Sequence, residues 1–372
     1  MRQFLFGHSS DKPADRLIDD CLSRIGAIPG DANFGFIYAT DSLTPELEMI
    51  LSILKRRTGI QHWTGTVGVG VSATGREYYE QPALAIMIAS FPETAFRTVP
   101  LQRASVDSFI NATGEWLQQD NFYFGILHGD PANRDTPALI AKLAERVPSA
   151  FFVGGLSSSH GRNLQVADTV STGGISGVLF SSAVPVATGH TQGCTPIAAK
   201  HIVTACDQNI IISLDDRPAL EVFNEDVGEM IAGDLQRIAG YIYVGLRIPG
   251  SDTGDYLVRN LVGIDPTQQL IAVSELLQEG GEVMFCRRDG DTAREDMRRM
   301  LADIRQRMPV TPKGAVYYSC TARGRYQFGE NSEELRLIRD ELGDFPLVGF
   351  FANGEIFHNR LYGYTGVLTV FC

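Results

Sequence analysis

A cysteine and an arginine follow the end of one predicted strand. Residues 316–319 (VYYS) are β-branched or aromatic, which is typical of a buried strand. Cys320, Arg323 and Gly324 come directly after it. Ligands of open α/β sheets bind at such strand ends, so a thiol and a guanidinium there indicate a binding site or a reactive thiol. The alternative is a cysteine that only fills space in the core, followed by a surface arginine.

Two further predicted strand ends carry small polar residues. One group follows the strand 150–154 and the other follows the strand 347–351; together they comprise Gly154, Gly155, Ser157, Ser158, Asn353, Gly354 and Glu355. Glycines let backbone amides approach a ligand, and hydroxyl and amide groups supply donors and acceptors. Glu355 could bind an amine or pair with Arg323, and Arg323 could hold a carboxylate. This set suits an amino acid; tight turns with a solvated Glu355 are the alternative.

Motifs for other chemistries are weak in this sequence. Residues 154–157 (GGLS) do not form a GxSxG nucleophile elbow, and GTVGVG lacks the strand–loop–helix order of a dinucleotide-binding loop. The adjacent Ser159 and His160 leave a Ser-His-Asp triad open without supporting one. The seven histidines show no metal-binding spacing, so no zinc site is expected. A single axial haem ligand would leave no spacing signature, and His190, near Cys194, is the candidate for it.

Composition and charge limit the classes of partner. The chain has 372 residues and a formal net charge of −12, which makes nucleic acid and anionic membranes poor partners. No apolar run is long enough to span a bilayer, and the first ten residues do not resemble a signal peptide. The six cysteines form no CxxC pair, which favours free thiols in a reducing cytoplasm.

The order of predicted elements repeats along the chain. A strand at 121–127, a helix at 136–147 and strands at 150–154 and 175–181 are matched by a strand at 315–319, a helix at 332–342 and strands at 347–351 and 364–371. Within them, residues 153–154 match 348–349, and 176–179 match 365–368. The strand 83–90 matches 282–287.

The repeat predicts an internal duplication. We expect a mixed α/β (α+β) fold of two similar halves, with mixed β-sheets flanked by helices, and an αββα-like arrangement would suit it. Equivalent strand ends would then face each other across a pseudo-twofold axis. The boundary between the halves falls near residues 217–240, where a second helix is expected at 225–238.

Several stretches in this order resemble the FIST family, named for F-box and intracellular signal transduction. They are VGGLSSS (153–159), TQGCTPI (191–197), IIISLDDRPALEV (210–222), LVRNLVGID (257–265), SCTARG (319–324) and GFFANGEI (349–356). The family pattern usually has arginine where this chain has Thr195, and often has glycine where it has Ala322. The resemblance implies an N-terminal lead-in at 1–32, a FIST N-type domain at 33–222 and a FIST C-type domain at 223–372. It adds Cys194 and Arg259 to the candidate ligand-binding residues.

The resemblance implies a sensory function. FIST proteins are regarded as small-ligand sensors with amino acids as proposed ligands, and some relatives are described as haem-containing nitric oxide sensors. We therefore expect a non-enzymatic cytoplasmic protein of signal transduction that binds an amino acid or similar polar ligand between its halves, with no cofactor required. A downstream kinase or cyclase is a possible partner. The alternatives are a haem-based gas sensor using His190 and a thiol enzyme or redox sensor using Cys320, whose thiol pKa Arg323 could lower.

Overall fold

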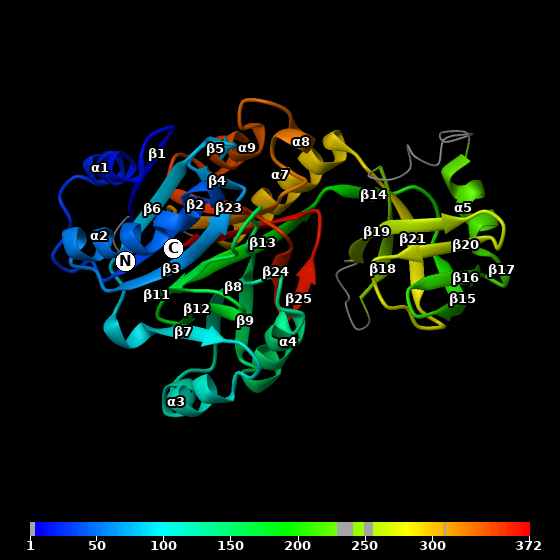
Figure 1. Ribbon diagram of the computed structural model, residues 1–372, viewed down its shortest axis with the longest axis horizontal. Helices are drawn as coiled ribbons and strands as arrows, with labels where there is room; N and C mark the ends of the chain where they lie inside the picture. Colours follow the sequence, from blue (N-terminus) through cyan, green and yellow to red (C-terminus); the bar gives the residue numbers. More distant parts are fainter. Residues whose placement is uncertain (1–3, 229–240, 249–255, 309) are drawn as a thin grey trace. The chain divides into compact units, whose positions relative to one another are not determined.

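The chain has a mixed α+β fold, as the sequence predicts (Figure 1). A computed structural model describes residues 4–228, 241–248, 256–308 and 310–372. The chain forms two compact units: unit 1 comprises Met1–Gln192 and Arg294–Cys372, and unit 2 comprises Gly193–Ala293. These units divide the chain differently from the predicted domain boundary at 222/223, which concerns family domains and stays a prediction.

Unit 1 contains three copies of one arrangement of elements. Each copy runs from an edge strand through a helix to two parallel strands joined by a helical segment, and then to a hairpin and a final strand. Copy 1 consists of β1 (Leu5–Ser10), α1 (Ala14–Ile25), β2 (Phe34–Thr40), η1 (Asp41–Glu46), α2 (Leu47–Thr58), β3 (His62–Gly68), β4 (Gly70–Ala73), β5 (Arg76–Tyr79) and β6 (Ala83–Ala89).

The second and third copies follow the same order. After η2 (Glu93–Ala95), copy 2 consists of β7 (Phe96–Gln102), α3 (Asp107–Leu117), β8 (Tyr123–Gly129), α4 (Thr136–Arg146), β9 (Ala150–Leu156), β10 (Gln165–Ala167), β11 (Thr169–Ser171) and β12 (Ile175–Ser181). Copy 3 consists of β13 (Val186–Gln192), α7 (Gly290–Arg307), β22 (Gly314–Cys320), α8 (Arg325–Phe328), α9 (Glu333–Leu342), β23 (Leu347–Ala352), β24 (Glu355–Phe357), β25 (Arg360–Tyr362) and β26 (Thr365–Phe371). Unit 2 follows β13 in the chain and ends within the first turn of α7.

Each copy builds most of one six-stranded sheet and contributes its hairpin to another. The strand orders are β1-β6-β2-β3-β10-β11 in sheet 1, β7-β12-β8-β9-β24-β25 in sheet 2 and β13-β26-β22-β23-β4-β5 in sheet 3. In every sheet the two central strands are parallel and their outer neighbours antiparallel. The hairpin of copy 1 lies in sheet 3, that of copy 2 in sheet 1 and that of copy 3 in sheet 2. The exchange is cyclic, so the copies are related by a pseudo-threefold axis.

One glycine occupies the same position in each parallel pair. Gly65 lies opposite Ile37, and the corresponding pairs are Gly154 with Leu127 and Gly349 with Tyr317. A Cβ atom at these glycines would lie 1.7, 1.8 and 1.7 Å from the carbonyl oxygen of the opposite residue. Only glycine fits there, because no side chain can be accommodated against the neighbouring backbone.

These glycines confirm the predicted match of residues 153–154 with 348–349, and they add a third copy that the sequence analysis missed. Two other matches do not hold. Gly177 lies opposite Leu127 but Gly366 lies opposite Ser319, two residues beyond the counterpart of Leu127, so the match of 176–179 with 365–368 is shifted by two residues. The strand 282–287 belongs to unit 2, whereas β6 corresponds to β12 and β26.

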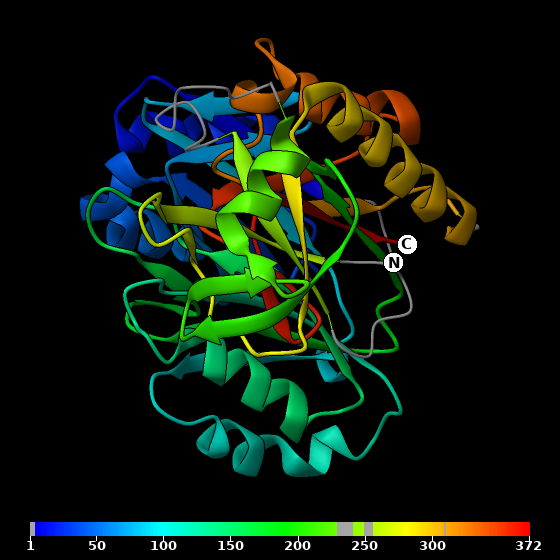
Figure 2. The ribbon, with the colours of Figure 1, turned by 90° about the vertical axis from the view of Figure 1, so that its right-hand side faces the viewer.

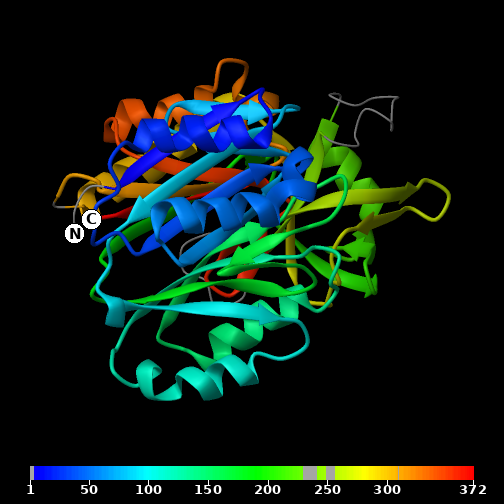
Figure 3. The ribbon, with the colours of Figure 1, turned by 60° about the vertical axis from the view of Figure 1, so that its left-hand side comes forward.

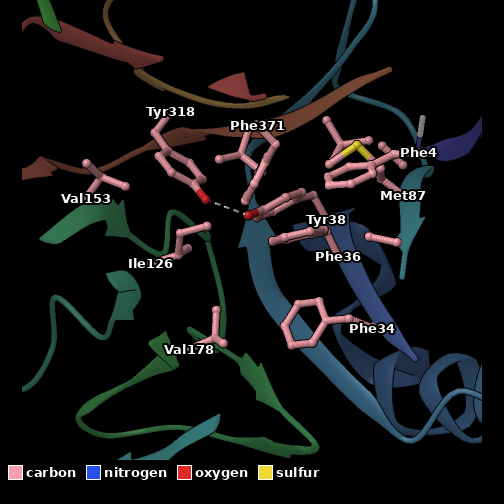
Figure 4. Close-up of a cluster of buried hydrophobic side chains, with 14 of the residues drawn as sticks. Phe4, Phe34, Phe36, Tyr38, Met87, Ile126, Val153, Val178, Tyr318 and Phe371 are labelled. Carbon is pink, nitrogen blue, oxygen red and sulfur yellow. Dashed lines mark hydrogen bonds between the residues drawn. The ribbon is translucent and has the colours of Figure 1, made fainter. Parts of the chain in front are cut away.

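The inner faces of the three sheets pack against one another around the axis. Figure 4 shows side chains from copy 1 (Phe36), copy 2 (Ile126) and copy 3 (Tyr318) pointing into this central core. Burial of such a continuous apolar surface is the main stabilising contribution. The predicted pseudo-twofold relation is therefore replaced by a threefold one.

Helices cover the outer faces of the sheets. Figure 3 shows α1 and α2 (blue) side by side over sheet 1, where they share a second buried cluster with the strands. In Figure 2, α3 and α4 lie along one side of sheet 2. Phe109 of α3 and Leu143 of α4 are buried in one cluster with residues of its strands. The residues predicted as a lead-in, 1–32, supply β1 and α1, and α1 buries an apolar face.

Unit 2 is an antiparallel sheet closed on itself. Its elements are β14 (Cys194–Pro196), β15 (His201–Asp207), β16 (Ile210–Leu214), β17 (Arg217–Pro218), α5 (Ala219–Val227), β18 (Ile242–Arg247), β19 (Tyr256–Asp265), β20 (Leu270–Val273) and β21 (Glu282–Arg288). The order β21-β15-β16-β20-β19-β18 closes because β18 also pairs with β21. The helix predicted at 225–238 lies mostly outside the described residues. Among the helices described in either unit, none is long and apolar enough to cross a membrane.

Candidate functional site

The two ends of the pseudo-threefold axis differ in chemistry. At the end where β2 begins, a cluster of phenylalanine rings fills the space between the sheets, with ring centroids 5.0–5.9 Å apart for pairs such as Phe91–Phe180 and Phe180–Phe371. Phe34, the first residue of β2, packs in the same cluster. This end is closed by apolar side chains, so a ligand site is expected at the other end, where the parallel strands finish.

A buried polar layer lies between the two ends. It takes one residue from the equivalent position of each copy: Tyr38, His128 and Tyr318. The hydroxyl of Tyr38 lies 2.9 Å from that of Tyr318 and 3.2 Å from Nε2 of His128, and Figure 4 shows the first of these bonds. Burial raises the pKa of both tyrosines and lowers the pKa of His128 to about 3, so all three are neutral near pH 7.

Beyond this layer a pocket opens at the carboxyl ends of the strands. Its volume is about 670 Å³, which is within the range of small-molecule sites. Residues from all three copies line it: Asp41, Ser42, Val69, Tyr79, Glu80, Gln81, Pro82, Ser158, Ser159, His160, Thr321, Arg325, Tyr326 and Asn353. The pocket lies wholly within unit 1.

Three of the lining residues occupy equivalent positions. In each copy, the polar-layer residue has a partner on the neighbouring parallel strand. Val69, Ser158 and Asn353 each lie three residues after that partner. Asp41 and Thr321 are equivalent to each other by the same register. The pocket therefore lies on the pseudo-threefold axis, and one fold position supplies an apolar side chain, a hydroxyl and an amide to its wall.

Ser158 fixes the wall of the pocket. It is buried, accepts a hydrogen bond from the backbone N–H of Val69 at 2.9 Å and donates one to the carbonyl of Phe351. It thereby joins copy 2 to copies 1 and 3. Asn353 has its backbone N–H bonded to the carbonyl of Leu156, and its exposed side-chain amide has no hydrogen bond within the described chain. That amide is free to bind a ligand.

The pocket also carries charged groups of both signs. Asp41 accepts hydrogen bonds from the backbone and the ring Nδ1 of His160, at 3.0 and 2.9 Å. Arg325 pairs with Glu80 at 2.5 Å and lies over the ring of Tyr79. A ligand with an amine and a carboxylate would find partners for both.

Arg323, by contrast, lies in a separate buried cluster. Its side chain and that of Glu334 are fully buried and form an ion pair at 2.8 Å. Glu334 accepts further hydrogen bonds from Tyr317, from Ser319 and from the backbone N–H of Gly324. The partner of Arg323 is therefore Glu334 rather than the expected Glu355, because the first turn of α9 brings Glu334 under the strand β22.

Cys320 and Glu355 lie at the edge of this cluster. Burial, with the charge of Glu355, raises the pKa of the Cys320 thiol to about 12. Burial likewise raises the pKa of Glu355 to about 8, although Thr365 donates two hydrogen bonds to it. A thiol with such a pKa stays protonated near pH 7, which argues against the reactive-thiol alternative.

The positions equivalent to Cys320 have other roles. Thr40 accepts a hydrogen bond from the backbone N–H of Ala83. Asp130 accepts hydrogen bonds from the hydroxyl of Thr172 and the backbone N–H of Gly173. The three copies therefore carry a hydroxyl, a carboxylate and a thiol at one position, and the first two serve the packing of the chain.

The remaining predicted residues near the site are mainly structural. Gly154 is one of the equivalent glycines, and a Cβ at Gly155 would lie 2.7 Å from Cβ of Ala352. Ser157 is buried against Thr66, with its hydroxyl 2.6 Å from that of Thr66. Gly324 has a positive φ of 54°, and a Cβ there would lie 1.9 Å from the Tyr79 hydroxyl. Gly354, with a φ of 117°, makes the turn that presents Asn353.

Cys194 and Arg259 belong to unit 2. Cys194 is buried in β14, where its carbonyl accepts a hydrogen bond from Tyr256. Arg259 pairs with Glu275 at 2.8 Å. Neither residue lines the pocket on the axis.

His190 lies in β13, opposite Val367. Its imidazole packs against the rings of Phe357 and Tyr362, with centroids 4.4 and 5.5 Å away. These surroundings give no support to an axial haem ligand, and haem binding stays a prediction that Soret absorption after reconstitution would test.

Ser158 and Asn353 are thus the predicted residues that the structure brings together in the pocket. The sequence analysis missed Asp41, Arg325 and the turn at Glu80. Asp41 could have been found, because it follows the strand of the unrecognised first copy, two residues after the counterpart of Gly129. The turn at Glu80 could not, since hairpin exchange places it in the pocket.

The structure thus defines a mixed α+β protein with three repeats around a pocket. Family models for the FIST N domain and the FIST C domain match residues 33–217 and 219–358, so the chain belongs to the FIST family, whose domains are sensory domains of signal transduction.

The chain is also similar to proteins without an assigned function. An uncharacterized protein of Mycobacterium tuberculosis (strain CDC 1551 / Oshkosh) is 32% identical over 324 residues, covering 82% of each chain. An uncharacterized protein of Mycobacterium bovis (strain ATCC BAA-935 / AF2122/97) is 30% identical over 326 residues, again covering 82% of each.

Proposed function

We propose that this protein is a cytoplasmic sensor that binds an amino acid or a similar small polar ligand in the pocket on the pseudo-threefold axis. One observation carries the proposal: residues of all three copies converge there, and the Asn353 amide points to no partner within the described residues. The FIST N and FIST C segments both contribute to the wall, so the ligand would bind between the two family domains.

The charges of the pocket support a zwitterionic ligand. Arg325 offers a guanidinium for a carboxylate, and Asp41 offers a half-buried carboxylate for an amine. A change in the pocket would reach all three sheets, because Ser158 bonds to both other copies. A downstream kinase or cyclase would then read this change.

Isothermal titration of the full chain against the twenty amino acids tests the proposal. We expect at least one to bind, and a concentration of 100 times its dissociation constant would stabilise the fold by about 2.7 kcal/mol. Asn353→Ala should weaken binding about three- to tenfold, because one hydrogen bond is lost. Asn111→Ala, at an exposed position on α3, is the matched control. If no amino acid produces heat or raises the melting temperature, the proposal fails.

A further inference from the structure

Arg325 lies against two neighbouring aromatic rings at the mouth of the pocket. The guanidinium carbon lies 4.7 Å from the ring centroid of Tyr79 and 5.0 Å from that of Tyr326. Nη2 also donates a hydrogen bond to the Tyr326 hydroxyl at 2.9 Å. The two ring centroids lie 6.4 Å apart, so the rings flank one side of the guanidinium and leave its other N–H groups for hydrogen bonds.

Those edges are only partly used. Nη2 bonds to Glu80 and Tyr326, and within the described chain neither Nε nor Nη1 of Arg325 has a hydrogen-bond acceptor. A guanidinium binds a carboxylate or phosphate best through two parallel hydrogen bonds. One oxygen of Glu80 accepts a hydrogen bond from one nitrogen of Arg325, so the second parallel hydrogen bond is missing.

Glu80 itself is weakly held. Its side chain is 74% exposed, whereas that of Arg325 is 25% exposed. Exposed ion pairs contribute little because water competes with both partners. The backbone of Glu80 also has a φ of 56°, in the left-handed region that non-glycine residues seldom adopt. A strained turn thus places a carboxylate against the guanidinium inside the pocket.

We infer that Arg325 is the anion-binding group of the pocket and that Glu80 stands in for the anion of the ligand. A ligand carboxylate or phosphate accepts two parallel hydrogen bonds, from Nη2 and from Nε or Nη1 of Arg325, and displaces Glu80 into solvent. The inference rests on the proposed function for the identity of the pocket, and it adds that every ligand carries an anionic group beside the Tyr79 and Tyr326 rings.

Removal of the internal competitor tests this inference. Glu80→Gln keeps the shape of the side chain and removes its charge, and Glu115→Gln, exposed on α3, is the matched control. Titrations would use inorganic phosphate and, separately, any amino acid that binds the wild type. Glu80→Gln should tighten binding about two- to fivefold, as expected for loss of an exposed ion pair, while the control leaves it unchanged. Unchanged or weaker binding in Glu80→Gln overturns the inference.

Changes at Arg325 complete the design. Arg325→Gln should abolish phosphate binding, and Arg325→Lys, which keeps the charge but not the two-bond geometry, should retain only part of it. Unaltered binding by Arg325→Gln, in a variant with the wild-type melting temperature, contradicts the assignment. Phosphate and carboxylate probes distinguish the two kinds of anion.

A chemical readout separates this inference from the proposed function. Phenylglyoxal modifies accessible arginines, and peptide mass spectrometry can follow Arg325 alone. We expect modification to be faster in Glu80→Gln than in wild type and slower in the presence of phosphate. If no amino acid binds but this pattern holds, the proposed ligand class fails and the anion site stands. If an amino acid binds the wild type and the pattern is absent, the anion site fails alone.

Discussion

Arg323 and Arg325 lie two residues apart on one turn and have opposite environments. Arg323 is fully buried, pairs with Glu334 and lies over the ring of Phe328, with 4.9 Å to its centroid. Arg325 is partly exposed, pairs with the exposed Glu80 and lies against two tyrosine rings. The strand β22 ends at the boundary between protein interior and pocket, and the two arginines that follow it lie on different sides of that boundary. A motif with two arginines therefore holds one structural cation and one available for a ligand.

Replacement of each arginine by methionine should separate the two roles most strongly. Arg323→Met leaves the Glu334 carboxylate buried without its partner, which typically costs about 3–5 kcal/mol. Arg325→Met breaks an exposed pair and should cost at most about 1 kcal/mol. Urea denaturation at pH 7 measures both free energies of unfolding.

The double variant Arg323→Met with Glu334→Leu is the control for this pair. Because it removes both charges, it should recover most of the stability lost in Arg323→Met. Equal destabilisation by the two single replacements would contradict the assignment of Arg323 to the interior.

The buried Glu355 should make the stability of the protein depend on pH. Burial raises the pKa of Glu355 to about 8, above the ordinary value of 4.5. Between these values the unfolded chain releases a proton that the folded protein keeps, so the free energy of unfolding falls as pH rises. Glu355→Gln removes this loss. The difference in free energy of unfolding between the variant and wild type should therefore shift by about 2–3 kcal/mol in favour of the variant from pH 5 to pH 7.

Denaturation curves at several pH values check this expectation, with the exposed Glu115→Gln as control. Burial and the charge of Glu334 also raise the pKa of Glu77 to about 8. Because Glu77 is still present in the variant, the free energy of unfolding of the variant also falls as pH rises. A constant difference between Glu355→Gln and wild type across this range would show that Glu355 is ionised in the folded protein.

The smallest expected effect concerns the glycine between the two arginines. Gly324→Ala places a methyl group 1.9 Å from the Tyr79 hydroxyl at a φ of 54°, whereas Gly329→Ala meets nothing within 4 Å at a φ of 97°. Both changes place an alanine at a positive φ, and Gly324→Ala alone adds a steric contact. We expect Gly324→Ala to be less stable than Gly329→Ala by about 1–2 kcal/mol, measured by thermal unfolding. Equal losses would show that Tyr79 moves away without cost.

Much of the fold could be predicted because local patterns determine it. The apolar strands of β8, β9, β22 and β23 and the glycines at 154 and 349 revealed two copies of the repeat. The first copy escaped notice because its glycine lies between Thr64 and Thr66. In the other two copies a valine precedes the glycine, and a larger or smaller residue follows it. Side-chain type varies freely there, since the required feature is only the close approach of two backbones.

The sequence alone determined the mixed α+β class, the family, and the polar strand ends at Ser158 and Asn353. Only the tertiary structure decided that three copies surround one axis, that Arg323 is buried and that Arg325 faces the pocket. The physical reason is that strand pairing and hairpin exchange join residues far apart in the chain. Burial and ion pairing, which decide the state of each charged group, are properties of that assembled neighbourhood.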